Sequence, residues 1–135
     1  MRAEDCIFFQ LGRANRAGTR FLNRRVADLG ITAVQAMALF FLAEADDVTS
    51  VHLGKRLQLD SATLTGLLDR LTAAGLAGRR ADPSDRRAVR ILLTEAGRAK
   101  VKRIKTLVAD ASREFLAALT PEERLILKSL LKKIR

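Results

Sequence analysis

The sequence predicts a mainly α-helical fold with one small β-hairpin, in which a helix-turn-helix is followed by the hairpin and flanked by helices at both ends. Three observations predict this class. Apolar residues recur at helical spacing along most of the chain. Two short helical segments adjoin in the middle, and a turn containing proline joins two extended runs directly after them. With 135 residues, 48% of them hydrophobic, the chain suits one domain with a sizeable core.

The first two helices are predicted from spacing and capping signals. Residues 5–29 carry apolar side chains at helical spacing, and Gly30 follows as a helix stop. Thr32 and Gln35 form a capping-box pair ahead of a strongly apolar run, which predicts a second, largely buried helix. A loop is expected over residues 45–47.

Two short helices are predicted next, at the centre of the chain. Thr49 is expected to cap the first of them, and Asp60 or Ser61 the second. Gly54 offers a small residue where the two helices would cross. The predicted buried stripe of the second helix consists of Leu64, Leu67, Leu68 and Leu71. Its outward residues are Ser61, Thr63, Thr65, Gly66 and Arg70.

A hairpin and two further helices complete the predicted order. Gly75 ends the helix, and "LAGRRA" and "AVRILL" then flank a "DPSD" turn in which Pro83 presets the backbone. Thr94 is expected to cap a long helix that runs to about residue 118. Thr120, with Pro121 directly after it, starts the last helix.

The charge of the chain predicts an acidic macromolecular partner. The formal net charge is +10, which by itself fits DNA, RNA or an anionic membrane. Residues 79–105 hold ten basic and three acidic residues, so much of the excess lies in one segment. Five arginines crowd the predicted hairpin: Arg79, Arg80, Arg86, Arg87 and Arg90. Because like charges repel, such a cluster indicates a polyanion nearby.

Several classes of protein are not expected. Cys6 is the only cysteine, which excludes an intramolecular disulfide and fits a reducing compartment. No apolar run of about 18 residues predicts a membrane span, and acidic residues near the N-terminus argue against a signal peptide, so we expect a cytoplasmic protein. No catalytic motif is found, and His52 has no cluster of ligands around it. We therefore expect no enzyme activity, metal or cofactor.

Three sequence words resemble the MarR family of bacterial transcriptional regulators: "LDRL…GL" at 68–76, "DRR" at 85–87 and "LTEAG" at 93–97. The order of the helices around them is also similar to that family, in which a helix-turn-helix followed by a basic hairpin forms a winged helix. The resemblance implies that the second helix of the motif enters the major groove of DNA and that an arginine at the wing tip reaches the minor groove. The implied DNA-binding residues are Ser61, Thr63, Thr65, Gly66, Arg70, Arg79, Arg80, Asp85, Arg86 and Arg87. Asp85 is expected to pair with a neighbouring arginine and hold the wing loop in shape.

The resemblance also implies an assembly. Within one chain of residues 1–135, we expect a DNA-binding lobe over 32–95 and dimerisation helices over 1–30 and 96–135, whose apolar stripes would lie exposed in a monomer. A two-fold homodimer would bind a pseudo-palindromic operator with half-sites about 10 bp apart, most often as a repressor. Many members of the family bind a small aromatic or phenolic effector, which would shift the population away from the DNA-competent state.

Two alternative functions stay open. The first is a non-specific architectural winged helix that binds DNA or RNA with an affinity that depends mainly on the salt concentration. The second is a repressor that senses oxidants through Cys6, because "LDSATLT" at 59–65 is similar to the branch of the family that senses organic hydroperoxides through an N-terminal cysteine. That branch relies on tyrosines near its cysteine, and this chain has no tyrosine.

Overall fold

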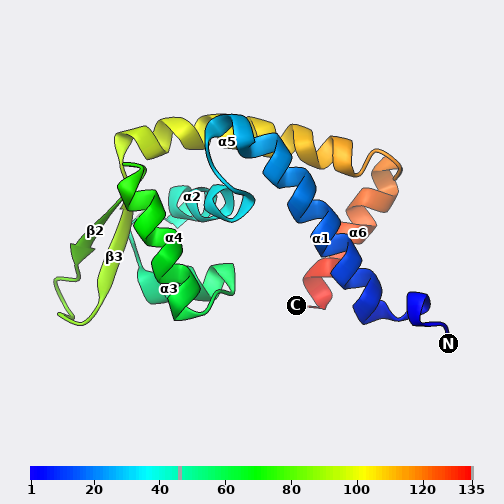
Figure 1. Cartoon of the computed structure of the whole chain (residues 1–135), viewed down its shortest axis with the longest axis horizontal. Helices are drawn as coiled ribbons and strands as arrows, with labels where there is room; N and C mark the ends of the chain where they lie inside the picture. The colour runs from blue at the N-terminus through cyan, green and yellow to red at the C-terminus, as the bar shows by residue number, and fades with distance from the viewer. Residues whose placement is uncertain (46, 135) are drawn as a thin grey trace.

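The computed structural model describes residues 1–45 and 47–134, and within them it contains six α-helices and a small three-stranded sheet (Figure 1). The elements, of which η1 and η2 are 3-10 helices, are η1 (Ala3–Asp5), α1 (Ile7–Val26), η2 (Ala27–Leu29), α2 (Ala33–Ala45), β1 (Val48–Thr49), α3 (Ser50–Leu57), α4 (Ser61–Ala73), β2 (Ala77–Ala81), β3 (Val89–Leu93), α5 (Glu95–Phe115) and α6 (Pro121–Lys133). The predicted fold class is confirmed. Residue 46, in the loop expected over 45–47, lies outside the described residues.

The first helix is shorter than predicted. α1 ends at Val26, and η2 tightens the chain before Gly30 closes the turn with a φ of 70°. Because side chains three residues apart eclipse each other in a 3-10 helix, Val26 and Leu29 both face the core, where both are buried. The predicted capping box of α2 is confirmed: the Thr32 N–H donates to Gln35 Oε1 at 2.9 Å, and the Gln35 N–H donates to Thr32 Oγ1 at 3.3 Å.

The sheet has one strand more than the predicted hairpin. β2 and β3 form the wing, with an antiparallel register from Ala77 opposite Leu93 to Ala81 opposite Val89. β1 pairs with the other edge of β3, so the strand order is β1-β3-β2. A strand of two residues is too short to show an alternating pattern, and Thr49 was recognisable only as the cap of α3. Pairing with β1 ties the base of the wing to the segment between α2 and α3.

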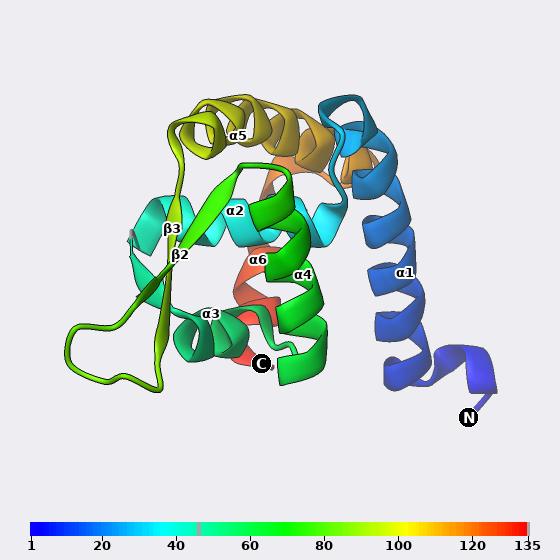
Figure 2. The ribbon, with the colours of Figure 1, turned by 60° about the vertical axis from the view of Figure 1, so that its left-hand side comes forward.

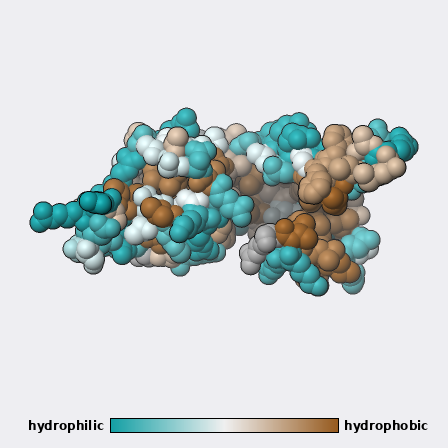
Figure 3. Space-filling view, turned by 90° about the horizontal axis from the view of Figure 1, so that it is seen from below, coloured by the Kyte–Doolittle hydropathy of each residue, from teal (hydrophilic) through white to brown (hydrophobic). Residues whose placement is uncertain are grey.

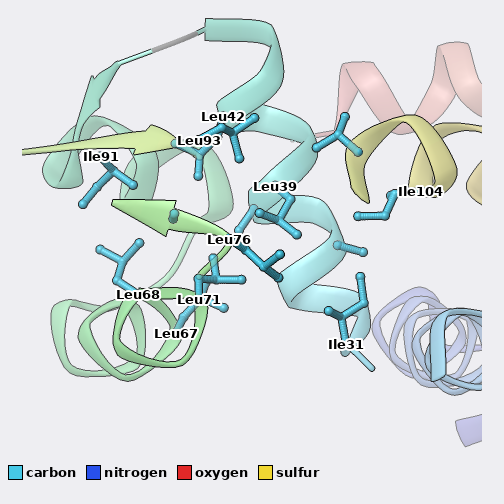
Figure 4. Close-up of a cluster of buried hydrophobic side chains, with 14 of the residues drawn as sticks. Ile31, Leu39, Leu42, Leu67, Leu68, Leu71, Leu76, Ile91, Leu93 and Ile104 are labelled. Atoms are coloured by element: carbon cyan, nitrogen blue, oxygen red, sulfur yellow. The ribbon is translucent and has the colours of Figure 1, made fainter. Parts of the chain in front are cut away.

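The hydrophobic core lies between α2, α3, α4, the sheet and the first half of α5 (Figure 4). Its largest fully buried side chains are Val26, Leu39, Leu42, Leu53, Leu67, Leu71, Ile91, Leu93 and Ile104. The predicted stripe of α4 is confirmed, because all four of its leucines are buried. Ile104 belongs to α5, so the long helix is part of the same core as the helix-turn-helix.

The end helices project from this core. α5 is capped by Thr94 as predicted, but it ends at Phe115, three residues before the predicted end. Its 21 residues span about 31 Å and lead to α6, which lies with α1 at the right-hand end of Figure 1. The predicted start of α6 at Thr120 is confirmed, and Thr120 and Glu123 form a capping box there. Among the described residues no single helix is long and apolar enough to cross a membrane, although the bent pair Ile7–Leu29 and Ala33–Ala45 passes by length and composition.

Candidate nucleic-acid interface

The two helices of the motif are fixed by local hydrogen bonds. Thr49 caps α3 by accepting the N–H of His52 at 3.2 Å. Asp60, one of the two predicted caps, starts α4 by accepting the Thr63 N–H at 2.8 Å and the Thr63 hydroxyl at 2.9 Å. These hydrogen bonds, led by that of the Thr63 backbone, lower the pKa of Asp60. Between the helices Gln58 adopts a left-handed φ of 54°, which turns the chain within two residues.

The face of α4 opposite its leucines points away from the core. Ser61, Thr63, Thr65 and Arg70 are exposed. Gly66 is half-buried, and beyond the local helix backbone no described atom lies within 4 Å of an added Cβ. The Thr65 hydroxyl donates to the Ser61 carbonyl at 2.8 Å, so it offers lone pairs rather than a proton to a ligand. The helix therefore presents a low, nearly uncharged surface at its N-terminal half.

Two residues of this face were missed in the sequence. Ala62 and Asp69 lie at the centre of the exposed side, about half a turn from the buried leucines. A small apolar side chain and an acid gave no DNA-binding signal. Asp69 is neutralised by Arg79 of β2, whose Nη2 lies 2.6 Å from Asp69 Oδ1. Helical spacing would have placed Ala62 on this face, because it is four residues from Gly66 along the helix, although its side chain alone gives no DNA-binding signal.

Three arginines lie on the strands of the wing, which we call its base to distinguish them from the loop at its tip, and all three are paired within the protein. In addition to the Arg79–Asp69 pair, Arg80 of β2 binds the carboxylate of Asp47. Arg90 of β3 donates from Nε to Asp82 Oδ2 at 3.0 Å and from Nη1 to the Asp47 carbonyl at 2.7 Å. All three of these arginines therefore have acceptors in the folded chain.

The arginines at the wing tip differ from those at the base. Arg86 and Arg87 are exposed, and their side chains have no partner among the described residues. Asp85 accepts the backbone N–H of Arg87 at 2.9 Å, so it shapes the loop through the backbone and not by the expected pairing with an arginine side chain. That pairing is made by Asp82, which also accepts the Ser84 N–H at 2.8 Å. The Ser84 hydrogen bond and the charge of Arg90 lower the pKa of Asp82.

The basic residues of the segment 79–105 lie in two separate parts of the fold. Of its ten basic residues, five lie in the wing and five on α5, which are Arg98, Lys100, Lys102, Arg103 and Lys105. α5 runs along the top of Figure 1, whereas the wing projects at the left-hand side (Figures 1 and 2). Only half of the basic residues in this segment therefore belong to the wing.

Comparisons with known proteins agree with this geometry. A model of the MarR family matches residues 29–88. The Multiple antibiotic resistance protein MarR of Escherichia coli (strain K12) is 37% identical over 121 residues, which are 89% of this chain and 84% of that protein. The chain belongs to the MarR family. It is a DNA-binding winged-helix transcriptional regulator and not an enzyme.

Two solved structures show the same fold over nearly the whole chain. A mutant MarR from E. coli complexed with operator DNA has a TM-score of 0.87 and 34% identity, and the match covers 99% of each chain. BpsR of Bordetella bronchiseptica, described with regulation of its DNA binding by 6-hydroxynicotinic acid, has a TM-score of 0.92 and 28% identity. That match covers 99% of this chain and 96% of BpsR.

Two further residues from the sequence lie outside the α4 and wing surface of this MarR-family chain. Cys6 is half-buried and directly precedes α1, and a redox role for it stays a prediction. His52 is exposed in the first turn of α3. Within the described part of the chain no group of three or more His, Cys, Asp or Glu residues could hold a metal ion.

Proposed function

We propose that the chain is a sequence-specific regulator of transcription, acting as a repressor, that binds a pseudo-palindromic operator as a homodimer. The observation that supports this most is the contrast within the wing. Arg86 and Arg87 are exposed at its tip with no side-chain partner among residues 1–45 and 47–134, whereas the arginines at its base are paired. Unpaired guanidinium groups on a projecting loop suit a narrow minor groove, where the negative potential is strongest.

The exposed face of α4 suits the adjacent major groove. The Ser61 hydroxyl can donate to or accept from base edges, the Thr65 hydroxyl offers lone pairs to donor groups there, and Gly66 permits a close approach of the helix to the bases. Arg70, on the flank of the helix, would bind phosphate. In this arrangement the wing and Arg70 supply most of the electrostatic affinity, and α4 supplies the discrimination between sequences.

The homodimer is supported by apolar side chains that the monomer leaves in water. Figure 3 shows hydrophobic residues gathered at the end of the molecule that holds α6 and the start of α1. Phe8 is 81% exposed and Leu125 is 69% exposed. A stable monomer would not leave an apolar surface that extends over two helices uncovered. The exposed large hydrophobic residues of these helices, with the C-cap residue of α6 as the last, are Ile7, Phe8, Phe9, Leu11, Leu125, Ile126, Leu130, Leu131 and Ile134. A second copy packed here about a two-fold axis would give a dimer with two winged lobes, which would bind half-sites about 10 bp apart.

An effector site is supported by a pocket between α1, α2 and α3. Its volume is about 440 Å³, and its lining includes Asn15, Thr19, Met37, Phe41 and Arg56. The Arg56 guanidinium lies 4.5 Å from the centre of the Phe41 ring and 3.1 Å from a carboxylate oxygen of Glu44. An aromatic or phenolic acid would suit this combination of a cation, an aromatic ring and an apolar wall. Such a ligand would release DNA if it favoured the DNA-incompetent spacing of the two lobes.

Fluorescence anisotropy tests the proposal. The purified protein is titrated into the duplex upstream of its own gene and into a scrambled duplex, at physiological salt and in the cytoplasmic pH range where we expect it to act. We expect tight binding to the first duplex that resists competitor DNA, and a loss of about 1–3 kcal/mol for one base-pair change in a half-site. Equal binding to both duplexes, with affinity set by salt alone, would favour the architectural alternative.

A further inference from the structure

Two arginines lie opposite each other across the wing. Arg80 of β2 and Arg90 of β3 are register partners in the antiparallel pair. Like charges in directly opposite positions destabilise a sheet, so this pair requires a compensating group. The charge of Arg90 is compensated by Asp82, and that of Arg80 by Asp47, which lies far away in the sequence and precedes β1.

Asp47 contacts both arginines through different atoms. Its carboxylate binds Arg80, and its backbone carbonyl accepts from Arg90 Nη1 at 2.7 Å. Asp47 has a left-handed φ of 61°, a conformation in which aspartate and asparagine are several-fold enriched among residues other than glycine. Its Oδ1 is buried and has no hydrogen-bond partner among the described residues. Leaving a buried acceptor without a partner is costly, so the contacts made by the other atoms of Asp47 must outweigh that cost.

The remaining contacts join Asp47 to the loop of the wing. Arg90 also binds Asp82, whose other carboxylate oxygen accepts the Ser84 N–H at the start of the tip. A continuous chain of contacts therefore runs from the segment between α2 and β1, through both strands of the wing, to the loop that carries Arg86 and Arg87. Asp47 directly precedes β1, which pairs with β3 at Val48 and Thr49.

We propose that Asp47, Arg80 and Arg90 are positioning residues that fix the direction of the wing relative to α4, and that Arg80 does not bind DNA. The inference rests on the proposed function, because it assigns a role within operator binding. It revises the role expected for Arg80 from the sequence. The guanidinium of Arg80 is held by a carboxylate, whereas those of Arg86 and Arg87 at the tip meet no carboxylate in the part of the chain that the structure describes.

Opposite changes of charge test the proposal. Asp47→Asn removes a negative charge and Arg80→Gln removes a positive charge, while both break the same pair. If Arg80 were a DNA ligand restrained by Asp47, Asp47→Asn would raise operator affinity and Arg80→Gln would lower it. If the two residues position the wing, both variants lower operator affinity, by about tenfold, and the double variant is no weaker than either single variant.

The salt dependence of binding gives a second readout. Each phosphate contact contributes about 0.9 to the slope of log K against log[salt]. We expect Arg80→Gln to keep the wild-type slope, and Arg87→Gln to reduce it by about 0.9. The matched control is Arg113→Gln on α5, which breaks an ion pair with Asp110 away from the wing. This control should alter neither the affinity nor the slope.

The outcomes are distinguishable. A rise in affinity for Asp47→Asn, or a flatter slope for Arg80→Gln, would overturn the positioning role and make Arg80 a DNA ligand. Unchanged affinity in both variants would also overturn it. Thermal melting of each variant checks that the lobe is folded, and Asp47→Asn remains informative if Arg80→Gln does not fold. If the wild-type protein fails to distinguish operator from scrambled duplex, the proposed function fails instead.

Discussion

Gly66→Ala is expected to stabilise the fold and weaken DNA binding. Gly66 lies in the middle of α4, and outside the local helix backbone no described atom lies within 4 Å of the Cβ that alanine would add. Glycine inside a helix costs about 0.5–1 kcal/mol relative to alanine, because it loses more backbone freedom on folding. With no clash to offset that gain, the free energy of unfolding should rise by about 0.5–1 kcal/mol.

On operator DNA the same methyl group should act in the opposite direction. If the exposed face of α4 lies against base edges, a methyl group at residue 66 fills the space that permits the close approach. An extra methylene-sized group in a packed contact costs about 1–3 kcal/mol, which corresponds to a loss of roughly 5- to 150-fold in affinity. The change in stability and the change in affinity should therefore have opposite signs.

Urea unfolding and anisotropy titration of the same preparations measure the two effects. Gly18→Ala serves as a matched control, since Gly18 lies inside α1 and, beyond the local helix backbone, an added Cβ would meet only the Phe115 ring among the described residues, at an ordinary 3.7 Å. This control should gain similar stability without a change in operator affinity. Unchanged affinity for Gly66→Ala would place residue 66 outside the interface, and a loss of stability would refute the geometry of α4.

Three further predictions follow from other parts of the chain. Gly97→Ala should lower the free energy of unfolding by about 3 kcal/mol, since the added Cβ would lie 2.0 Å from the Leu76 carbonyl oxygen; a urea midpoint equal to that of the wild type would contradict this. Leu130→Glu on α6 should convert the dimer into a monomer in sedimentation at micromolar concentration, and a wild-type monomer there would argue against the interface. Because the folded pKa values of Asp60 and Asp82 are lowered, their stabilising contribution is present above about pH 4 and is lost as the pH falls through the folded values; a melting temperature that stays level from pH 6 to pH 3 would be inconsistent with it.

The caps of the helices could be predicted from the sequence because they depend on residues three apart. Thr32, Thr49, Thr94 and Thr120 each accept the backbone N–H three positions later, as expected. The buried stripe of α4 was predictable for a similar reason, since its period is that of the helix. The ends of helices were less predictable. α1 and α5 each end three residues before the predicted end. The residues after α1 form the tighter 3-10 helix η2, and the α-helix of α5 stops at Phe115.

The contacts that organise the wing could not be predicted from local patterns. Arg80 meets Asp47 across 33 positions, and Arg79 meets Asp69 across ten, so neither pair has a sequence signature. The expected partner of an arginine, Asp85, differs from the observed one, Asp82, by three residues in a loop whose backbone decides the direction of each carboxylate. The basic cluster predicted an acidic partner, but only the fold separates the exposed tip from the paired base.

Selection from a random duplex library tests the central claim most directly. The protein is mixed with the library at physiological salt, bound duplexes are recovered and sequenced, and each position of the resulting consensus is then substituted singly in anisotropy titrations. We expect a pseudo-palindrome with two half-sites centred about 10 bp apart, and losses of about 1–3 kcal/mol at the positions under α4. A pool without consensus after selection, bound with an affinity that follows salt alone, would contradict sequence-specific binding by a winged-helix dimer.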